Sequence, residues 1–197
     1  MLPLVVLLFF GIIDGGRYLW EVNRASKATQ AGARAAAVTH MVPQGLANYS
    51  FAISAGIPQG QPVSEAYFTG VQCEQAGGSV DCDWLGSPSD DFDLDPLDCA
   101  FDTVVNRMRV FMPRLETENV VVAYYNSGLG FSGDPSGPDV APLISVRLKD
   151  IDFQPILTGL FGLSWPLPSS DYTITQEDGM GWKYEEVPND NECDASA

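Results

Sequence analysis

The hydrophobic pattern is strongest at the start of the chain. Residues 1–13, MLPLVVLLFFGII, contain no charged side chain, and water is a poor solvent for such a run. A helix that crosses the hydrocarbon core of a bilayer needs roughly twenty apolar residues, so this run is shorter than a complete span. We expect it to be buried in lipid or against other subunits, or to form a core helix at a chain terminus. Its apolar side chains are Leu2, Pro3, Leu4, Val5, Val6, Leu7, Leu8, Phe9, Phe10, Ile12 and Ile13.

Helical character continues through residues 14–38. Asp14 and Arg17 mark the polar boundary behind the apolar run, and their spacing favours a local i,i+3 ion pair. Small residues recur at steps of three and four on one face, at Ala25, Ala28, Gly32 and Ala35. Such a face lets another backbone approach closely, either within the chain's own domain or between subunits. We expect the helix to end near Met41, before Pro43.

The pattern after Pro43 predicts both helix and strand. Residues 97–111 place apolar side chains at helical spacing, with Asp95 as the N-cap and Pro96 at the first helical position. Runs rich in β-branched and aromatic residues predict strands. They cover short strands within 65–82, then 119–126, 144–153, where the alternation slips at Asp150, and 171–176. The expected fold is α+β: a long N-terminal membrane-anchoring helix packed on a small antiparallel sheet, with an additional amphipathic helix.

Charge divides the chain near residue 42. Residues 1–42 carry four basic and two acidic side chains, whereas residues 43–197 carry six basic and twenty-four acidic ones. We therefore predict a transmembrane and stem helix over 1–42 and an acidic, disulfide-bonded extracytoplasmic α+β domain over 43–197. A domain with this excess of acidic side chains repels nucleic acid, because proteins bind nucleic acid through cationic contacts to its phosphates. No nucleic-acid partner is expected.

The cysteines predict disulfides. All four lie in the acidic region, at Cys73, Cys82, Cys99 and Cys193. They form no CxxC pair and the single histidine is far away in the sequence, which disfavours a zinc site. Two disulfides formed in an oxidising compartment are expected instead. We favour Cys73 with Cys82, because Gly-Gly between them is typical of a tight hairpin, and Cys99 with Cys193, although four cysteines allow three connectivities.

Motifs for catalysis are missing from the sequence. It contains no Gly-x-Ser-x-Gly elbow, His-Glu-x-x-His motif or phosphate-binding glycine loop, and His40 is expected on the surface at a helix C-terminus. We predict a non-enzymatic protein without a cofactor. Alternating aspartates raise calcium as a disfavoured alternative, near Asp91, Asp93 and Asp95. In that register Pro96 replaces the required glycine and Asp102 replaces the bidentate glutamate.

Several N-terminal features point to a family. They are Leu2-Pro3, Asp14, Gly16-Arg17 and the sequence AGARAA at residues 31–36. This pattern resembles the N-terminal signature of TadE-like minor pilins, or pseudopilins, of the tight-adherence (Flp) pilus system. Residues 144–157, ISVRLKDIDFQPIL, look like the family's late strand and apolar loop, whereas residues 43–119 match no motif. The resemblance implies a pilin-like fold.

Members of that family usually carry a prepilin cleavage site and a glutamate upstream of the Leu-Pro. In pilins this glutamate is thought to pair with a neighbour's terminal amine during assembly. Neither feature lies in the sequence, and we expect that the front of a longer helix is missing. Asp14 is a candidate replacement for the acid, but Arg17 one turn away favours the local pair.

The resemblance implies a structural function. It predicts a minor pilin that joins a tight-adherence pilus through its N-terminal helix, anchored in the bacterial inner membrane with its C-terminal domain periplasmic or extracellular. The implied partners are other pilins or membrane protein subunits, and membrane lipid. Two alternatives stay open: a single-pass accessory subunit of a larger membrane complex, and a secreted adhesion or binding module that uses loops such as 127–142.

Overall fold

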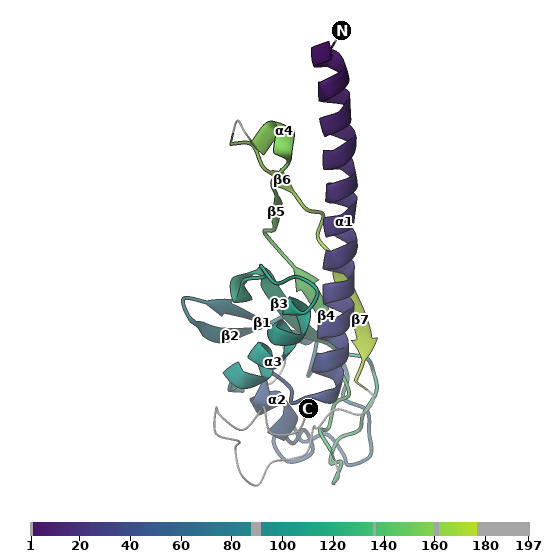
Figure 1. Ribbon diagram of the computed structural model, residues 1–197. Coiled ribbons are helices and arrows are strands. Elements are labelled where there is room, and N and C mark those ends of the chain that lie inside the picture. The colour runs from purple at the N-terminus through teal and green to yellow at the C-terminus, as the bar shows by residue number, and fades with distance from the viewer. Residues whose placement is uncertain (1, 88–91, 136, 160–161, 177–197) are drawn as a thin grey trace.

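The computed structural model describes residues 2–87, 92–135, 137–159 and 162–176. Its longest element is helix α1 (Leu2–Val38), whose N-terminal half projects beyond the sheet (Figure 1). The helix ends at Val38 rather than near Met41, where the hydroxyl of Thr39 donates to the carbonyl of Ala35 at 2.8 Å and satisfies an acceptor of the last turn. Pro43 lies beyond this end and pairs with Pro96 in an isolated antiparallel bridge.

An antiparallel sheet forms the centre of the protein. Its strand order is β2-β1-β3-β4-β7, and each neighbouring pair is antiparallel. The strands are β1 (Gly70–Ala76), β2 (Ser79–Trp84), β3 (Val120–Tyr125), β4 (Leu143–Leu148) and β7 (Asp171–Thr175). Helices α1 and α3 (Asp98–Arg109) pack together, and the α+β class predicted from the sequence is confirmed.

The β1–β2 hairpin follows directly from its turn sequence. Gly77 and Gly78 connect the strands and both have positive φ, +66° and +99°. A two-residue turn of this kind needs residues that tolerate the left-handed region, and its twist matches that of the flanking strands. The register places Cys73 opposite Cys82, which brings the two sulfur atoms within bonding reach.

The strand predicted over 144–153 is interrupted. Strand β4 ends at Leu148, and Asp150 adopts a positive φ of 54°, a conformation that breaks a ladder. The chain then forms a separate short strand, β5 (Asp152–Phe153), which pairs with β6 (Trp165–Pro166). The single slip in the alternation at Asp150 therefore marks the point where the chain leaves the main sheet.

The start of α3 differs from the prediction. The N-cap position is Leu97 and not Asp95, which has a positive φ of 42°. The carboxylate of Asp93 accepts the N–H of Asp95 at 3.1 Å, so the aspartates shape the turn before the helix. Asp98, the first residue of α3, accepts the N–H of Val80 at 3.0 Å and ties the helix to the hairpin.

The hydrophobic core lies between the sheet and the two helices. Alternate residues of β3 belong to it: Val120, Val122 and Tyr124. The buried C-terminal half of α1 contributes alanines to the same core, and the small helix α2 (Gln44–Asn48) contributes Leu46. A short 3-10 helix, η1 (Thr117–Asn119), leads from α3 into β3. The stem helix is therefore an integral layer of the folded domain.

Candidate assembly helix and its apolar arm

The N-terminal half of α1 exposes an uninterrupted apolar surface. Side chains are described from residue 5 onwards, and those at residues 5–10, 12 and 13 are 36–65% exposed. Because consecutive positions point 100° apart, these residues cover every side of the helix. A helix that is apolar all round is typical of burial in lipid or among other helices. Among the described residues, no helix combines the length and apolarity that crossing a bilayer requires.

Asp14 ends the apolar surface and makes contacts that the sequence did not predict. The residue is 3% exposed. Its carboxylate accepts the N–H groups of Ile156 at 2.8 Å and Leu157 at 2.9 Å, the first two residues of the short helix α4 (Ile156–Gly159). Arg17 contributes the i,i+3 ion pair at 3.2 Å that the spacing predicted. Asp14 thus fixes α4 against α1.

Hydrogen bonding favours the charged form of Asp14. The hydrogen bond from the Ile156 N–H and that from Leu157 hold the pKa of this carboxyl below its ordinary value, since both stabilise the anion. Arg17 acts in the same direction, whereas burial opposes it. The carboxylate is already engaged by three donors within its own chain. This arrangement disfavours Asp14 as a replacement for an assembly glutamate.

The segment that carries α4 reaches along α1 away from the sheet (Figure 1). We call residues 151–159 and 162–167 the arm. Its two strands, β5 and β6, form a hairpin stem in which Phe153 faces Trp165. Ile156, Leu163 and Trp165 are 44–56% exposed. The arm therefore brings further apolar side chains beside α1.

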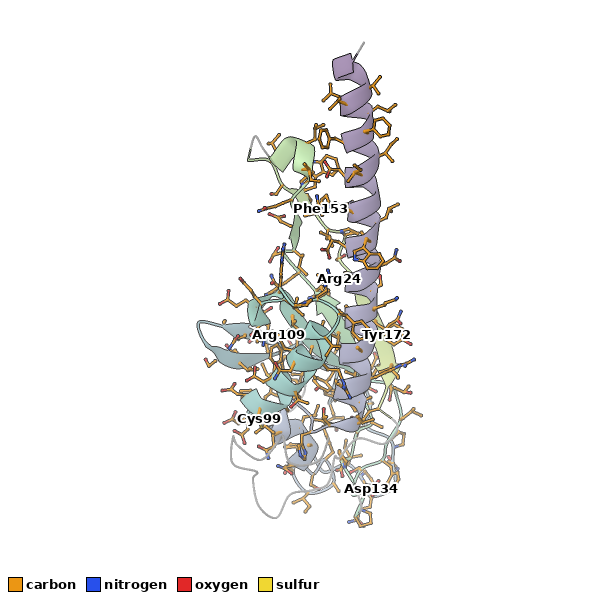
Figure 2. All side chains as sticks on the ribbon, in the orientation of Figure 1. Arg24, Cys99, Arg109, Asp134, Phe153 and Tyr172 are labelled. Carbon is orange, nitrogen blue, oxygen red and sulfur yellow. A yellow bond between two sulfur atoms is a disulfide. The ribbon has the colours of Figure 1, made fainter. Side chains whose placement is uncertain are left out.

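Aromatic contacts and a cation join the arm to α1. The guanidinium of Arg17 lies 5.3 Å from the ring centroid of Phe153, which Figure 2 labels beside the helix. Tyr18 meets the rings of Phe153 and Trp165 edge-on, at 5.5 and 6.3 Å between centroids. Edge-to-face pairs and cation–π contacts favour such geometry. One turn of α1 therefore holds the arm through Asp14, Arg17 and Tyr18.

The small-residue face of α1 packs inside the protein. All four members of the face are buried: Ala25, Ala28, Gly32 and Ala35. A Cβ atom added at Gly32 would lie 2.7 Å from Cγ and Sδ of Met108 on α3, and 3.3 Å from a methyl of Val146 on β4. Of the two uses left open by the sequence, the structure shows the packing of α1 on its own domain.

Comparison with known families adds one finding. Residues 1–34 match the model of the TadE family, described as TadE-like protein. The chain has a TadE-like N-terminus. The match covers most of α1 and ends before the rest of the domain, whose residues carry no part of it. Neither a curated protein nor a solved structure matches the chain significantly.

The TadE-like helix continues into a domain that contains a disulfide. Cys73 and Cys82 are joined across β1 and β2, with 4.1 Å between their Cα atoms. Cys99 lies at the start of α3 (Figure 2) and its thiol is not free. Cys193 lies outside the described residues, so the pairing of Cys99 with Cys193 stays a prediction. The disulfide that is described closes the outer hairpin of the sheet.

The structure places two of the three aspartates considered for calcium, and it places His40, the residue considered for acid–base chemistry. Among the residues that the structure describes, no group of three or more His, Cys, Asp or Glu side chains is placed to hold a metal ion. Asp91, one of the three residues considered for calcium, lies outside the described residues. His40 lies two residues beyond the end of α1 and is half-buried, and burial lowers its pKa.

The sequence reasoning missed the arm as an element. The pattern of residues 144–157 predicts a strand followed by an apolar loop, and it indicates neither α4 nor the contact with Asp14. A weak signal was present, because Pro155 precedes Ile156 and proline is favoured at helix starts. The partner of that helix start lies 142 residues away, however, and no local pattern identifies it.

Proposed function

We propose that this protein is a non-enzymatic subunit of a tight-adherence pilus, a TadE-like minor pilin that joins the assembly through α1. The observation that carries the proposal is the coincidence of two features in one segment. Residues 1–34 match the TadE family, and the apolar residues within that match are exposed on every side of a projecting helix. Exposed apolar surface of this extent marks a site of interaction.

The mechanism is insertion of a helix and involves no covalent chemistry. Residues 5–13 make apolar contacts with lipid before assembly and with neighbouring helices afterwards. Because lipid tails are as apolar as leucine, the quality of helix packing decides whether the segment leaves lipid for its neighbours. The core holds the C-terminal half of α1, and the arm holds the turn that contains Asp14, Arg17 and Tyr18. The domain therefore follows its helix as a rigid body when the helix enters an assembly.

We propose that the helix anchors the chain in the bacterial inner membrane, with the domain periplasmic or extracellular. The Cys73–Cys82 disulfide supports this location, because structural disulfides form and persist in oxidising compartments. The acidity of residues 43–197 keeps the domain soluble and dispersed. Trapping of the thiols in intact cells should find Cys73 and Cys82 oxidised; free thiols on both would contradict the location.

Two matched substitutions test the role of the apolar surface. Leu8 and Leu19 have the same exposure on α1, 61% and 62%, but only Leu8 lies in the apolar segment before Asp14. Leu8→Glu should abolish membrane retention and recovery in purified pili, because a charge in the buried segment costs several kcal/mol. Leu19→Glu should retain both. Equal behaviour of the two variants would show that residues 5–13 are not the inserted surface.

A photo-crosslinking residue at position 8 identifies the neighbour. In the native host we expect it to capture pilin or other pilus subunits, while the same residue at the exposed Asp102 of α3 should capture none of them. Stoichiometric capture of subunits from a complex unrelated to pili would overturn the pilus assignment. It would favour the alternative in which the same helix anchors an accessory subunit of a larger membrane complex.

A further inference from the structure

The arm lies where the apolar surface of α1 ends. Figure 1 shows it beside the helix, extended away from the sheet toward the N-terminal half of α1, and α4 contacts α1. The residue of α1 that binds α4 is Asp14, which directly follows Ile13, the last residue of the apolar segment. The arm and the end of the apolar segment therefore occupy the same level along the helix axis.

The arm turns the first N–H groups of α4 and the ring of Phe153 toward α1, and it leaves other apolar side chains exposed. The first two N–H groups of α4 bond to Asp14, and Arg17 lies over Phe153. The exposed side includes Ile156, Leu163 and Trp165, 47%, 56% and 44% exposed. Helix-start N–H groups without a partner are costly wherever water is scarce. Asp14 removes that cost for the N–H groups of Ile156 and Leu157.

The residue types at this level match those of a membrane–water boundary. Tyr18 and Trp165 lie in contact at 6.3 Å between ring centroids, and Arg17 is on the same turn of α1. Tryptophan and tyrosine are enriched where headgroups meet acyl chains, and arginine places its charge in the aqueous layer while its stem stays in apolar surroundings. This aromatic and cationic level is continuous with the apolar segment on one side and the acidic domain on the other.

We infer that the arm is an interfacial lipid contact: Ile156, Leu163 and Trp165 enter the headgroup region of the bilayer that holds α1 and fix the height of the domain above it. The inference rests on the proposed membrane anchoring of α1. A bilayer surface is the occupant that the geometry favours, because the exposed residues of the arm lie at the level where the all-round apolar surface ends. A second copy of the chain at this surface is an outcome that the test distinguishes.

Depth-dependent quenching of tryptophan fluorescence tests the inference on the full chain in phosphatidylcholine–phosphatidylglycerol vesicles. The chain has four tryptophans, so one variant keeps only Trp165 and a control keeps only Trp84, in strand β2. A third variant carries Leu8→Trp with the native tryptophans replaced, and reports insertion of α1. Lipids brominated near the headgroup, lipids brominated deep in the acyl chain, and aqueous acrylamide serve as quenchers.

We expect headgroup-level bromolipid to remove most of the Trp165 emission, deep bromolipid to quench the tryptophan at position 8, and only acrylamide to affect Trp84. Quenching at position 8 without lipid quenching of Trp165 would overturn the inference and leave the anchor intact. Loss of lipid quenching at both positions would overturn the lipid contact of the arm and also the membrane anchoring of α1. Shielding of Trp165 that disappears on dilution with lipid would assign the surface to a second copy and overturn the lipid contact.

Discussion

The carboxylate of Asp14 accepts a hydrogen bond of 2.8 Å from the backbone N–H of Ile156, 142 residues later in the chain. This contact joins the end of the apolar segment to the start of α4. It explains why an acidic side chain is buried beside an exposed apolar surface: its negative charge complements the unpaired N–H groups at a helix start. Asp14 is thus the polar boundary of the apolar segment and also positions a second apolar element.

Removing the Asp14 carboxylate should release the arm. Asp14→Ala leaves the N–H groups of Ile156 and Leu157 without an acceptor, so we expect both amides to exchange faster, as measured by hydrogen–deuterium exchange with mass spectrometry of the full chain in detergent. Asp14→Asn should lie between this variant and the parent, because its amide oxygen retains one acceptor. The core amides of β3 should keep their protection.

Asp152 provides the control for that experiment. It lies in the same arm but is exposed, and it accepts only the Ser164 hydroxyl, at 3.0 Å, among the contacts described for it. Asp152→Asn should leave the exchange of Ile156 and Leu157 close to that of the parent. Unchanged exchange in Asp14→Ala would show that the arm is held without its carboxylate.

Gly32 should tolerate no large side chain. Leucine at this position would displace Met108 and press on Val146, and overpacking of this kind costs about 1–3 kcal/mol of unfolding free energy. Gly16 has open space around it on the same helix, so Gly16→Leu should change stability by less than about 0.5 kcal/mol or increase it. Chemical denaturation of the full chain in micelles measures both. Equal effects at the two positions would contradict the close packing at Gly32.

The hydroxyl of Tyr124 should contribute measurable stability. It accepts the buried N–H of Val42 at 3.1 Å, and burial raises its pKa well above the ordinary value for tyrosine. Tyr124→Phe leaves that N–H unsatisfied, which costs about 1–3 kcal/mol of unfolding free energy. Tyr125→Phe, one residue on and 39% exposed, should cost less than about 0.5 kcal/mol. A neutral Tyr124→Phe would mean that Val42 finds another acceptor.

Stability should fall as the pH drops through the range in which His40 titrates. Burial lowers the pKa of this histidine in the folded protein from its ordinary 6.5, so the unfolded chain binds the proton more readily. The stability that neutral His40 contributes is therefore complete above the pKa that the histidine has in the unfolded chain. This stability is lost as the pH falls from that value toward the lower pKa of His40 in the folded protein. Melting temperatures from about pH 8 to about pH 5.5 should decline less in His40→Gln than in the parent. Parallel curves would assign the decline to other groups.

Local patterns in the sequence account for much of the fold. The Gly-Gly turn predicts the β1–β2 hairpin because only a few residues adopt the required positive φ, and the β-branched run at 119–126 predicts β3. The spacing of Asp14 and Arg17 predicts their ion pair. Each of these features is decided within a few residues, where propensity and side-chain spacing act directly. The sequence places the N-cap of α3 at Asp95, two residues before its position at Leu97. Local capping competes there with contacts to residues distant in sequence, because Asp98 accepts the N–H of Val80 and Pro96 pairs with Pro43.

The sequence by itself determined that this protein has an apolar N-terminal segment, an acidic domain and a hairpin whose two cysteines can form a disulfide, since hydrophobicity, charge and turn conformation belong to the residues themselves. Only the tertiary structure decided which face of α1 is buried against α3 and that Asp14 holds the arm. The physical reason is that these contacts join residues roughly seventy to one hundred and forty positions apart. Their formation depends on the whole sheet and its connections, to which no local pattern is sensitive.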